Sequence, residues 1–167
     1  MSRDKEIMEK RAMKLATLPA AESTANMLVV EFVLHPEHYA FETAYVKEVL
    51  TLKELTSIPG TPEYVMGVIL FRGKILSILN LKNLFGLREQ GLTEFNKILV
   101  ISNQQMEFGI LADRICNQNT IDAATLSDRP IHFGNSQVDF IKGITPEGLI
   151  LLDAEKMLGS KSLIVNH

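Results

Sequence analysis

The 167-residue chain has a single cysteine, no tryptophan and few aromatic residues, which make up 7% of it. One cysteine excludes an intrachain disulfide and a cysteine-based metal cluster, and it favours a reducing compartment. The absence of any run of about 18 apolar residues excludes a transmembrane helix. The 17 basic and 20 acidic side chains give a net charge of −3, whereas a general nucleic-acid binder needs a basic surface. We therefore expect a cytoplasmic protein with no nucleic-acid partner and no membrane insertion.

Hydrophobic residues are abundant, at 46% of the chain, and are sufficient for a core that needs no disulfides. The segment 1–26 differs from the rest. It begins with charged residues rather than the apolar stretch of a secretory signal. Apolar and charged residues then interleave up to Leu18, which predicts a short amphipathic helix followed by a linker. Such an extension is typical of a frayed terminus, and a helix that docks on a partner is the alternative.

From residue 27 onward, short β-type runs alternate with turn signals such as Pro59-Gly60 and Gly73. Short helices are predicted at 82–85 and 154–158. Short, evenly spaced strands favour small barrels over a parallel sheet with crossing helices. The predicted strands are 28–34, 39–42, 45–52, 64–71, 74–81, 98–102, 107–113, 115–121, 140–144 and 149–152.

An internal repeat organises these strands. The tripeptide at 39–41 is echoed at 108–110, and the segment 73–86 is echoed at 148–159. In each copy a glycine suits a hairpin turn, and Asn80 or Asp153 can cap the helix that follows. The repeat predicts a mainly β protein with two five-stranded barrels side by side. We expect subdomains at about 27–90 and 95–159, and a tail at 160–167.

Catalytic and metal motifs are not supported by the sequence. The segment 67–74 resembles a phosphate loop, but five residues separate its glycines and Ile75 follows the lysine where Ser or Thr is needed. The cluster His35-Pro36-Glu37-His38 is interpreted as a solvated turn, because a third or fourth metal ligand is not apparent in the sequence. Cys116 is predicted to be a buried, inert thiol in a strand. We expect no enzymatic activity, no cofactor and no metal.

The segment 58–75, Ile-Pro-Gly-Thr-Pro-Glu-Tyr-Val-Met-Gly-Val-Ile-Leu-Phe-Arg-Gly-Lys-Ile, resembles the CheW family of chemotaxis coupling proteins. The flanking segments 32–49, 98–113, 140–143 and 151–158 resemble the family in the same order, so the resemblance covers about residues 27–159. Leu70, Ser77 and Asn80 differ from the residues usual in the family.

The resemblance implies a cytoplasmic adaptor with two SH3-like five-stranded barrels and short helices at the barrel ends. Its implied partners are the cytoplasmic tip of methyl-accepting chemotaxis receptors and the regulatory domain of a CheA-type histidine kinase. The protein is then a monomer alone and an array component in the complex. Residues matching the receptor groove and its charge pair are Val46, Glu48, Gly67, Arg72, Ile115 and Gln118. Residues matching the kinase side are Leu55, Ile58, Pro59 and Gly60.

Some of these residues also have a purely structural interpretation. A Glu48–Arg72 pair can be an ordinary surface ion pair worth under about 1 kcal/mol, and Val46 and Ile115 can be strand core. Two alternative functions are also retained. One is a CheW-like scaffold of another kinase pathway, such as surface motility. The other is a small-molecule module with a pocket between two barrels.

Overall fold

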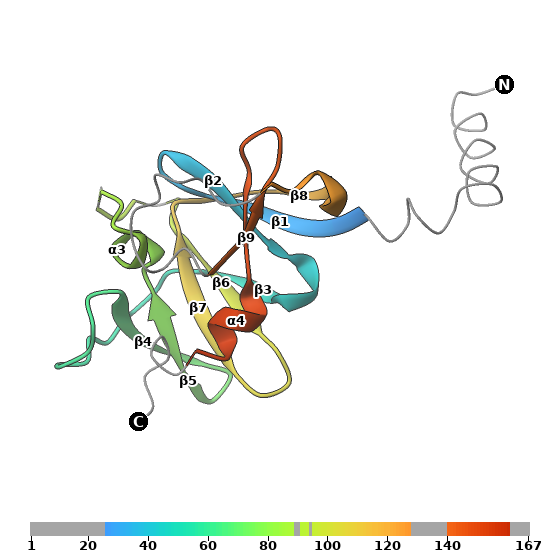
Figure 1. Ribbon diagram of the computed structural model, residues 1–167. Helices are drawn as coiled ribbons and strands as arrows, with labels where there is room; N and C mark the ends of the chain where they lie inside the picture. The colour runs from blue at the N-terminus through green and yellow to red at the C-terminus, as the bar shows by residue number, and fades with distance from the viewer. Residues whose placement is uncertain (1–25, 89–90, 94, 128–139, 161–167) are drawn as a thin grey trace, which may run out of the picture.

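The computed structural model describes residues 26–88, 91–93, 95–127 and 140–160, and these form two five-stranded sheets with a few short helices (Figure 1). The predicted helix in residues 1–26 and most of the predicted tail lie outside the described residues. The first sheet contains β1 (Asn26–Leu34), β2 (Glu37–Glu42), β8 (Arg114–Asp122), β9 (Ile141–Ile144) and β10 (Ile150–Leu152). The second contains β3 (Val46–Thr51), β4 (Val65–Phe71), β5 (Lys74–Leu79), β6 (Lys97–Ser102) and β7 (Glu107–Ala112). The predicted class, mainly β with two five-stranded units, is confirmed.

The strands of the two sheets do not divide at the predicted subdomain boundaries of 27–90 and 95–159, because the two halves of the chain exchange strands. The strand orders are β8-β1-β2-β10-β9 and β3-β6-β7-β5-β4. After β2 the chain passes through a 3-10 turn, Thr43–Tyr45, into the second sheet, and it returns to the first only at β8. The second sheet is therefore continuous in sequence, whereas the first is built from both ends. A repeat in sequence shows that two similar units exist, but not which copies pair.

The repeat itself is visible in the pairing register. In the first sheet β10 runs parallel to β2 with Leu151 opposite Ala40, and in the second β5 runs parallel to β7 with Ile78 opposite Gly109. These pairs occupy matching places in the two sequence copies. The same correspondence holds for the capped helices. The Asn80 side chain accepts a hydrogen bond from the backbone N–H of Lys82 at the start of α3 (Leu81–Phe85), and Asp153 caps α4 (Ala154–Leu158) likewise.

Alternating side chains divide the core into three clusters. On β6, Leu99 and Ile101 belong to a central core with members from both sheets, whereas Ile98 and Val100 belong to a cluster within the second sheet. A smaller cluster within the first sheet contains Val29, Ala40, Leu149 and Leu151. The short helices α3 and α4 contribute their apolar pairs to the central core. The two sheets are thus joined by the largest cluster, so their relative arrangement is part of the folded core.

A buried ion pair lies where the chain crosses back between the sheets. Lys82, at the start of α3, is 3% exposed, and its Nζ lies 2.7 Å from Oδ2 of Asp113, which follows β7. The same carboxylate oxygen accepts the backbone N–H of His35 from the β1–β2 turn at 2.8 Å. His35 and Pro36 form the predicted turn.

Among the described residues, none of the helices has the length and apolar character needed to cross a bilayer.

Candidate functional site: a partner-binding surface

Arg72 lies in a two-residue hairpin turn between β4 and β5. Phe71 pairs with Lys74, and the two residues between them have positive φ angles, 50° for Arg72 and 79° for Gly73. Positive φ at both central positions is the type I′ geometry, whose twist matches that of antiparallel strands. From this turn the Arg72 Nη2 donates to Oε1 of Glu48 on β3. The predicted Glu48–Arg72 pair is therefore present.

This pair connects the two edges of the second sheet, because β3 and β4 are the first and last strands in its order. The guanidinium carbon of Arg72 also lies over the Phe71 ring, 5.0 Å from its centre. The side chains of Arg72 and Glu48 are 64% and 31% exposed. An ion pair this exposed contributes less than about 1 kcal/mol to stability. Its main effect is to fix where a cation and a carboxylate stand on the surface.

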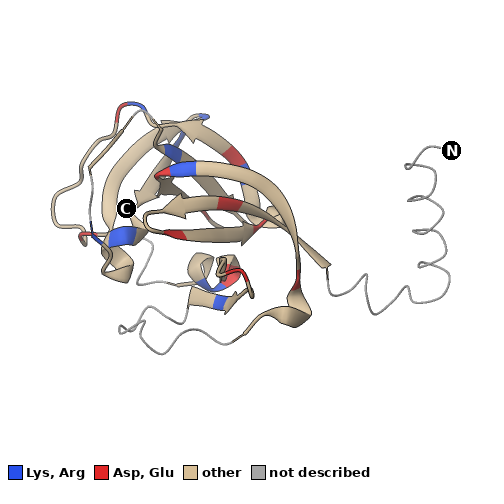
Figure 2. Cartoon of the chain, turned by 90° about the horizontal axis from the view of Figure 1, so that it is seen from above, with Lys and Arg blue, Asp and Glu red and all other residues tan. Residues whose placement is uncertain are grey.

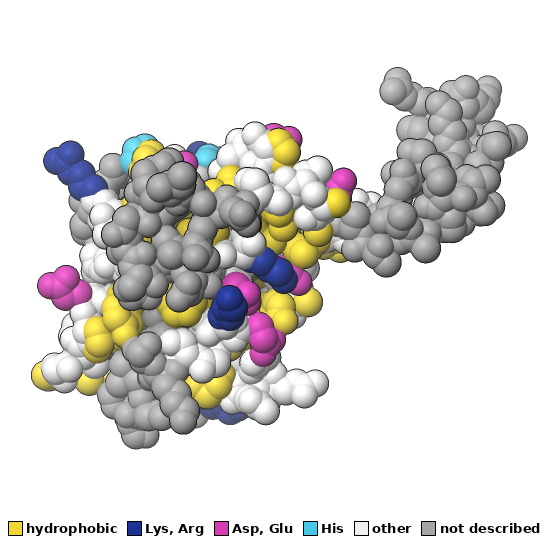
Figure 3. Space-filling model, in the orientation of Figure 1, with side chains coloured by type: hydrophobic (Ala, Val, Ile, Leu, Met, Phe, Trp, Pro, Cys, Tyr) yellow, Lys and Arg dark blue, Asp and Glu magenta, His cyan; other side chains and the backbone are white. Residues whose placement is uncertain are grey.

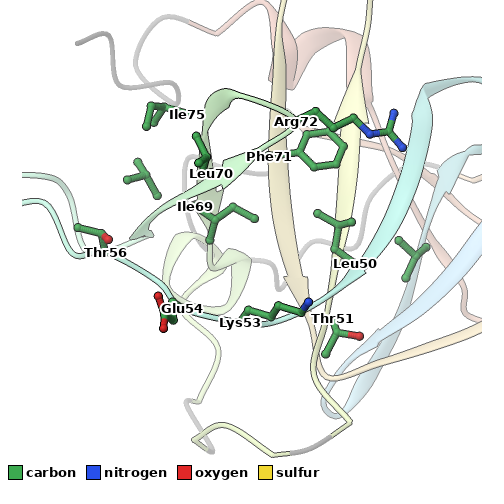
Figure 4. A pocket seen from close by; sticks show the side chains of 12 residues that line it. Leu50, Thr51, Lys53, Glu54, Thr56, Ile69, Leu70, Phe71, Arg72 and Ile75 are labelled. Atoms are coloured by element: carbon green, nitrogen blue, oxygen red, sulfur yellow. The ribbon is translucent and has the colours of Figure 1, made fainter.

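An apolar groove of about 780 Å³ lies beside this pair, between β3 with its following segment and the β4–β5 hairpin (Figure 4). Leu70 and Ile75 stand on the hairpin and are 73% and 66% exposed, and Val49 on β3 is 43% exposed. Arg72, Lys53 and Glu54 add charges to the lining. Exposed apolar side chains flanked by charged ones are typical of a protein-binding surface. Figure 3 shows apolar side chains beside charged ones on the face of the molecule that is seen in Figure 1.

Leu70, Ile75 and Val49 were not among the predicted contacts. The strand pattern nevertheless contained a signal for them. In a hairpin whose Phe71 and Leu76 point into the core, the neighbouring positions 70 and 75 point outward. Two large apolar residues at outward positions beside a turn therefore indicate a contact surface.

Val46 and Ile115 occupy equivalent positions in the two sheets. Val46 starts β3 opposite Ile101, and Ile115 lies near the start of β8 opposite Phe32. Both are half-buried and pack against the central core. Gln118 is exposed on β8, an edge strand of the first sheet. Val46 and Ile115 thus contribute to the core and keep some exposed surface, whereas Gln118 is exposed.

Gly67 has a structural role and is buried. A Cβ at this position would lie 2.3 Å from the carbonyl oxygen of Thr56, because the segment before β4 crosses directly over the strand. The crossing is fixed by two hydrogen bonds between Thr56 and Val68, of 2.9 and 2.8 Å. The structure gives this glycine no exposed surface for a partner.

The four residues predicted for the kinase side lie in the segment between β3 and β4, and they differ in burial. Leu55 is half-buried and packs against the core cluster of the second sheet. Ile58 is also half-buried, and its carbonyl accepts the Thr61 hydroxyl at 2.9 Å. Pro59 and Gly60 are exposed at the turn. Of these four residues, only Pro59 and Gly60 are exposed.

Electrostatics next to Val46 involve Tyr45. A hydrogen bond to the Glu155 carboxylate, together with partial burial, raises the pKa of Tyr45 to about 12. Elsewhere the charges of both signs are scattered over the strands (Figure 2).

The fold and this surface define the class of the protein. It has two linked β sheets and an apolar groove beside a fixed ion pair, as expected of a binding protein.

Comparison with known proteins identifies the family. The CheW-like domain model matches residues 28–162, and the chain belongs to this family of non-enzymatic scaffolding proteins in chemotaxis-type signalling. "Chemotaxis protein CheW" of Treponema pallidum is 29% identical over 153 residues, covering 87% of this chain and 90% of the relative. "Protein PilI" of Pseudomonas aeruginosa is 24% identical over 82% of this chain and 78% of its own length.

A solved structure supports the same assignment. The scaffolding protein TtCheW from Thermoanaerobacter tengcongensis superposes with a TM-score of 0.69 at 27% identity, covering 75% of this chain and 83% of that one. The resemblance predicted from segments 32–158 is thereby confirmed.

Proposed function

We propose that this chain couples the cytoplasmic tips of chemoreceptors to the regulatory domain of a CheA-type histidine kinase, beneath the cytoplasmic membrane. The observation that carries the proposal is the fixed Glu48–Arg72 pair beside the groove with Leu70 and Ile75 on its rim. A charged pair provides orientation and selectivity, and the apolar rim provides area that a partner can cover. The family membership supplies the class of partner.

The two surfaces are separable in this proposal. The groove, the Arg72 turn and the 55–60 segment lie on the second sheet, whereas Gln118 lies on the edge of the first. Val46 and Ile115 are half-buried next to the central core that joins the sheets. A scaffold needs two such surfaces so that one partner does not displace the other. We therefore assign the groove to the kinase, and the residues Val46, Ile115 and Gln118 to the receptor.

Binding of receptor tip and kinase regulatory domain, both from the same organism, tests the proposal. We expect Arg72→Glu to weaken binding of the kinase regulatory domain at least tenfold, because the substitution places two carboxylates together at the groove. The melting temperature is expected to fall only slightly. Lys142→Glu is the matched control, since Lys142 forms an exposed ion pair of the same kind with Glu42 at 2.6 Å, away from the groove. Loss of binding by both variants, or by neither, would contradict the proposal.

A second candidate is the same scaffold in a different kinase pathway, since the chain is also similar to Protein PilI, a relative that does not carry the name CheW. Binding assays with each receptor and kinase pair that the organism encodes separate the two. The chain is expected to bind one pair more tightly than the others.

Size-exclusion chromatography of the chain alone is expected to give a monomer.

A further inference from the structure

A histidine, a cysteine and a glutamate come together on the first sheet. Glu31 is on β1, His38 on β2 and Cys116 on β8, which are neighbouring strands. Each residue offers one ligand atom: a carboxylate oxygen, a ring nitrogen and a sulfur. These three atoms lie within 4.8 Å of one another, and none of the three residues is fully buried. The sequence separates Cys116 from His38 by 78 positions, so only the strand exchange brings them together.

A β-bulge turns Cys116 toward the other two residues. Val30 pairs with Gln118 and Phe32 with Ile115, so Glu31 alone faces Cys116 and Asn117. A bulge re-aims a side chain and is often found beside functional sites. The ligands therefore stand on hydrogen-bonded strands rather than on a loop, which holds them in place before any ion arrives.

The hydrogen bonds around the carboxylate of Glu31 resemble the outer shell of a metal site. Its Oε1 accepts from Nδ2 of Asn119 at 2.6 Å, and its Oε2 lies 2.6 Å from Nδ1 of His38. An amide that orients a ligating carboxylate is a usual outer-shell contact. The His38 contact brings a nitrogen and an oxygen ligand atom together at the place where a cation would be bound.

The adjoining pocket favours a cation. It has a volume of about 520 Å³, and the described residues that line it include the carboxylates of Glu31, Glu37 and Glu147 but no lysine or arginine. An ion bound to the cluster therefore enters from a negatively charged mouth, where a solvent molecule can complete its coordination.

The second sheet has a lysine where the first has this cysteine. Lys47 follows Val46 as Cys116 follows Ile115. In both sheets the strand-pairing register shifts directly after the first of these two residues. Glu107 corresponds in the same way to His38. In the second sheet Nζ of Lys47 lies 3.1 Å from Oε1 of Glu107. One copy of the repeat thus holds its own cation, and the other presents sulfur, nitrogen and oxygen donors at the equivalent place.

We propose that Glu31, His38 and Cys116 bind one Zn²⁺ ion, with water as the fourth ligand. Zinc takes this combination of thiolate, imidazole and carboxylate in tetrahedral geometry. On binding, Nδ1 of His38 and the Glu31 carboxylate turn from each other to the ion, the ring proton moves through solvent to Nε2, and the thiol proton of Cys116 passes to solvent. The bound ion crosslinks β8 to β1 and β2, one residue from Ile115.

Titration of the reduced, full-length chain tests the proposal. Calorimetry with Zn²⁺ is expected to show one site, and Co²⁺ is expected to give thiolate-to-cobalt charge-transfer absorption. Cys116→Ser should abolish that absorption, and His38→Asn should weaken Zn²⁺ binding at least tenfold. Asn119→Ala is expected to weaken it about 10–100-fold through loss of the outer-shell contact. His35→Asn, in the turn just before β2 and outside the cluster, is the control and should bind as the unmodified chain does.

A second measurement uses the unmodified protein and does not depend on how a variant folds. Cys116 is the only cysteine, so the rate of thiol alkylation reports on it alone. Saturating Zn²⁺ should slow alkylation at least tenfold, and EDTA should restore the rate. Unchanged alkylation together with no charge-transfer band would overturn the proposal. So would Zn²⁺ binding that is the same in Cys116→Ser and His38→Asn as in the unmodified chain.

Discussion

At the scale of single residues, Arg72 illustrates how a binding surface is maintained at some expense to stability. Its φ of 50° is in the left-handed region, which costs a non-glycine residue roughly 1–3 kcal/mol. The ion pair with Glu48 and the contact with Phe71 offset part of this cost, but the Arg72 side chain is exposed, so each is worth about 1 kcal/mol or less. An asparagine or glycine suits the turn better. The arginine is therefore explained by what it presents to a partner.

Tyr45 gives a pH-dependent prediction at the same scale. Its pKa is raised to about 12 in the folded chain, chiefly by the hydrogen bond to Glu155. The folded state thus holds the phenol proton more tightly than the unfolded chain, whose tyrosine has a pKa near 10. The resulting stability is fully present below about pH 10 and is lost as pH rises toward 12.

We expect Tyr45→Phe to flatten the fall in the free energy of unfolding between these pH values, measured by urea denaturation. Tyr64→Phe serves as the control tyrosine substitution. A fall of the same steepness in Tyr45→Phe and the unmodified chain would contradict the assignment.

At the scale of elements, the crossing of the 52–64 segment over β4 shapes the groove. The hydrogen bonds between Thr56 and Val68 hold the segment against the strand, and Gly67 leaves room for it. Lys53, Glu54 and Thr56 thereby become one wall of the groove. The length of this segment and its turn residues thus determine the shape of the partner surface, even where its side chains point into solvent.

Gly67→Ala is predicted to destabilise the fold by about 3 kcal/mol or more, because its methyl group meets the Thr56 carbonyl and its φ of 153° disfavours a side chain. Gly60→Ala is the matched control. Gly60 has φ of 81° but nothing within 4 Å of an added Cβ, so we expect only about 1–2 kcal/mol from backbone strain. Chemical denaturation measures both. Equal losses would show that the crossing exerts no steric constraint.

The sequence was sufficient for local features and insufficient for long-range pairing. The hairpin turn at Gly73, the caps at Asn80 and Asp153 and nearly all strand positions follow from short-range patterns, and the structure confirms them. The Glu48–Arg72 pair followed only from the family resemblance. The exchange of strands was not predictable, because the β6–β7 hairpin has the same alternating pattern whichever sheet it joins. The meeting of Cys116 with His38 was missed for the same reason.

At the scale of the whole molecule, the exchanged strands make the two sheets mutually dependent. The first sheet needs β1 and β2 from the start of the chain and β8, β9 and β10 from its end. The largest apolar cluster then joins both sheets. A partner that contacts either sheet thus contacts a body whose two parts share one core, which suits a scaffold that must hold two proteins in a fixed relation.

This dependence predicts how fragments behave. Chains 1–92 and 93–167 each lack strands of both sheets, so each alone should be unfolded by circular dichroism. Mixed together they should form a folded complex, since every strand is again available. Independent folding of either fragment would contradict the exchange, because it is the outcome expected of two sequential subdomains.

The most direct test of the account is whether this chain places a kinase under receptor control. Receptor in membranes, the cognate CheA-type kinase and this chain are combined, and kinase autophosphorylation is measured with and without chemoeffector. We predict activity that responds to the chemoeffector with the unmodified chain and with Lys142→Glu, and activity that no longer responds with Arg72→Glu or without the chain. A folded chain that leaves the kinase unresponsive to every receptor of its organism would contradict the central claim.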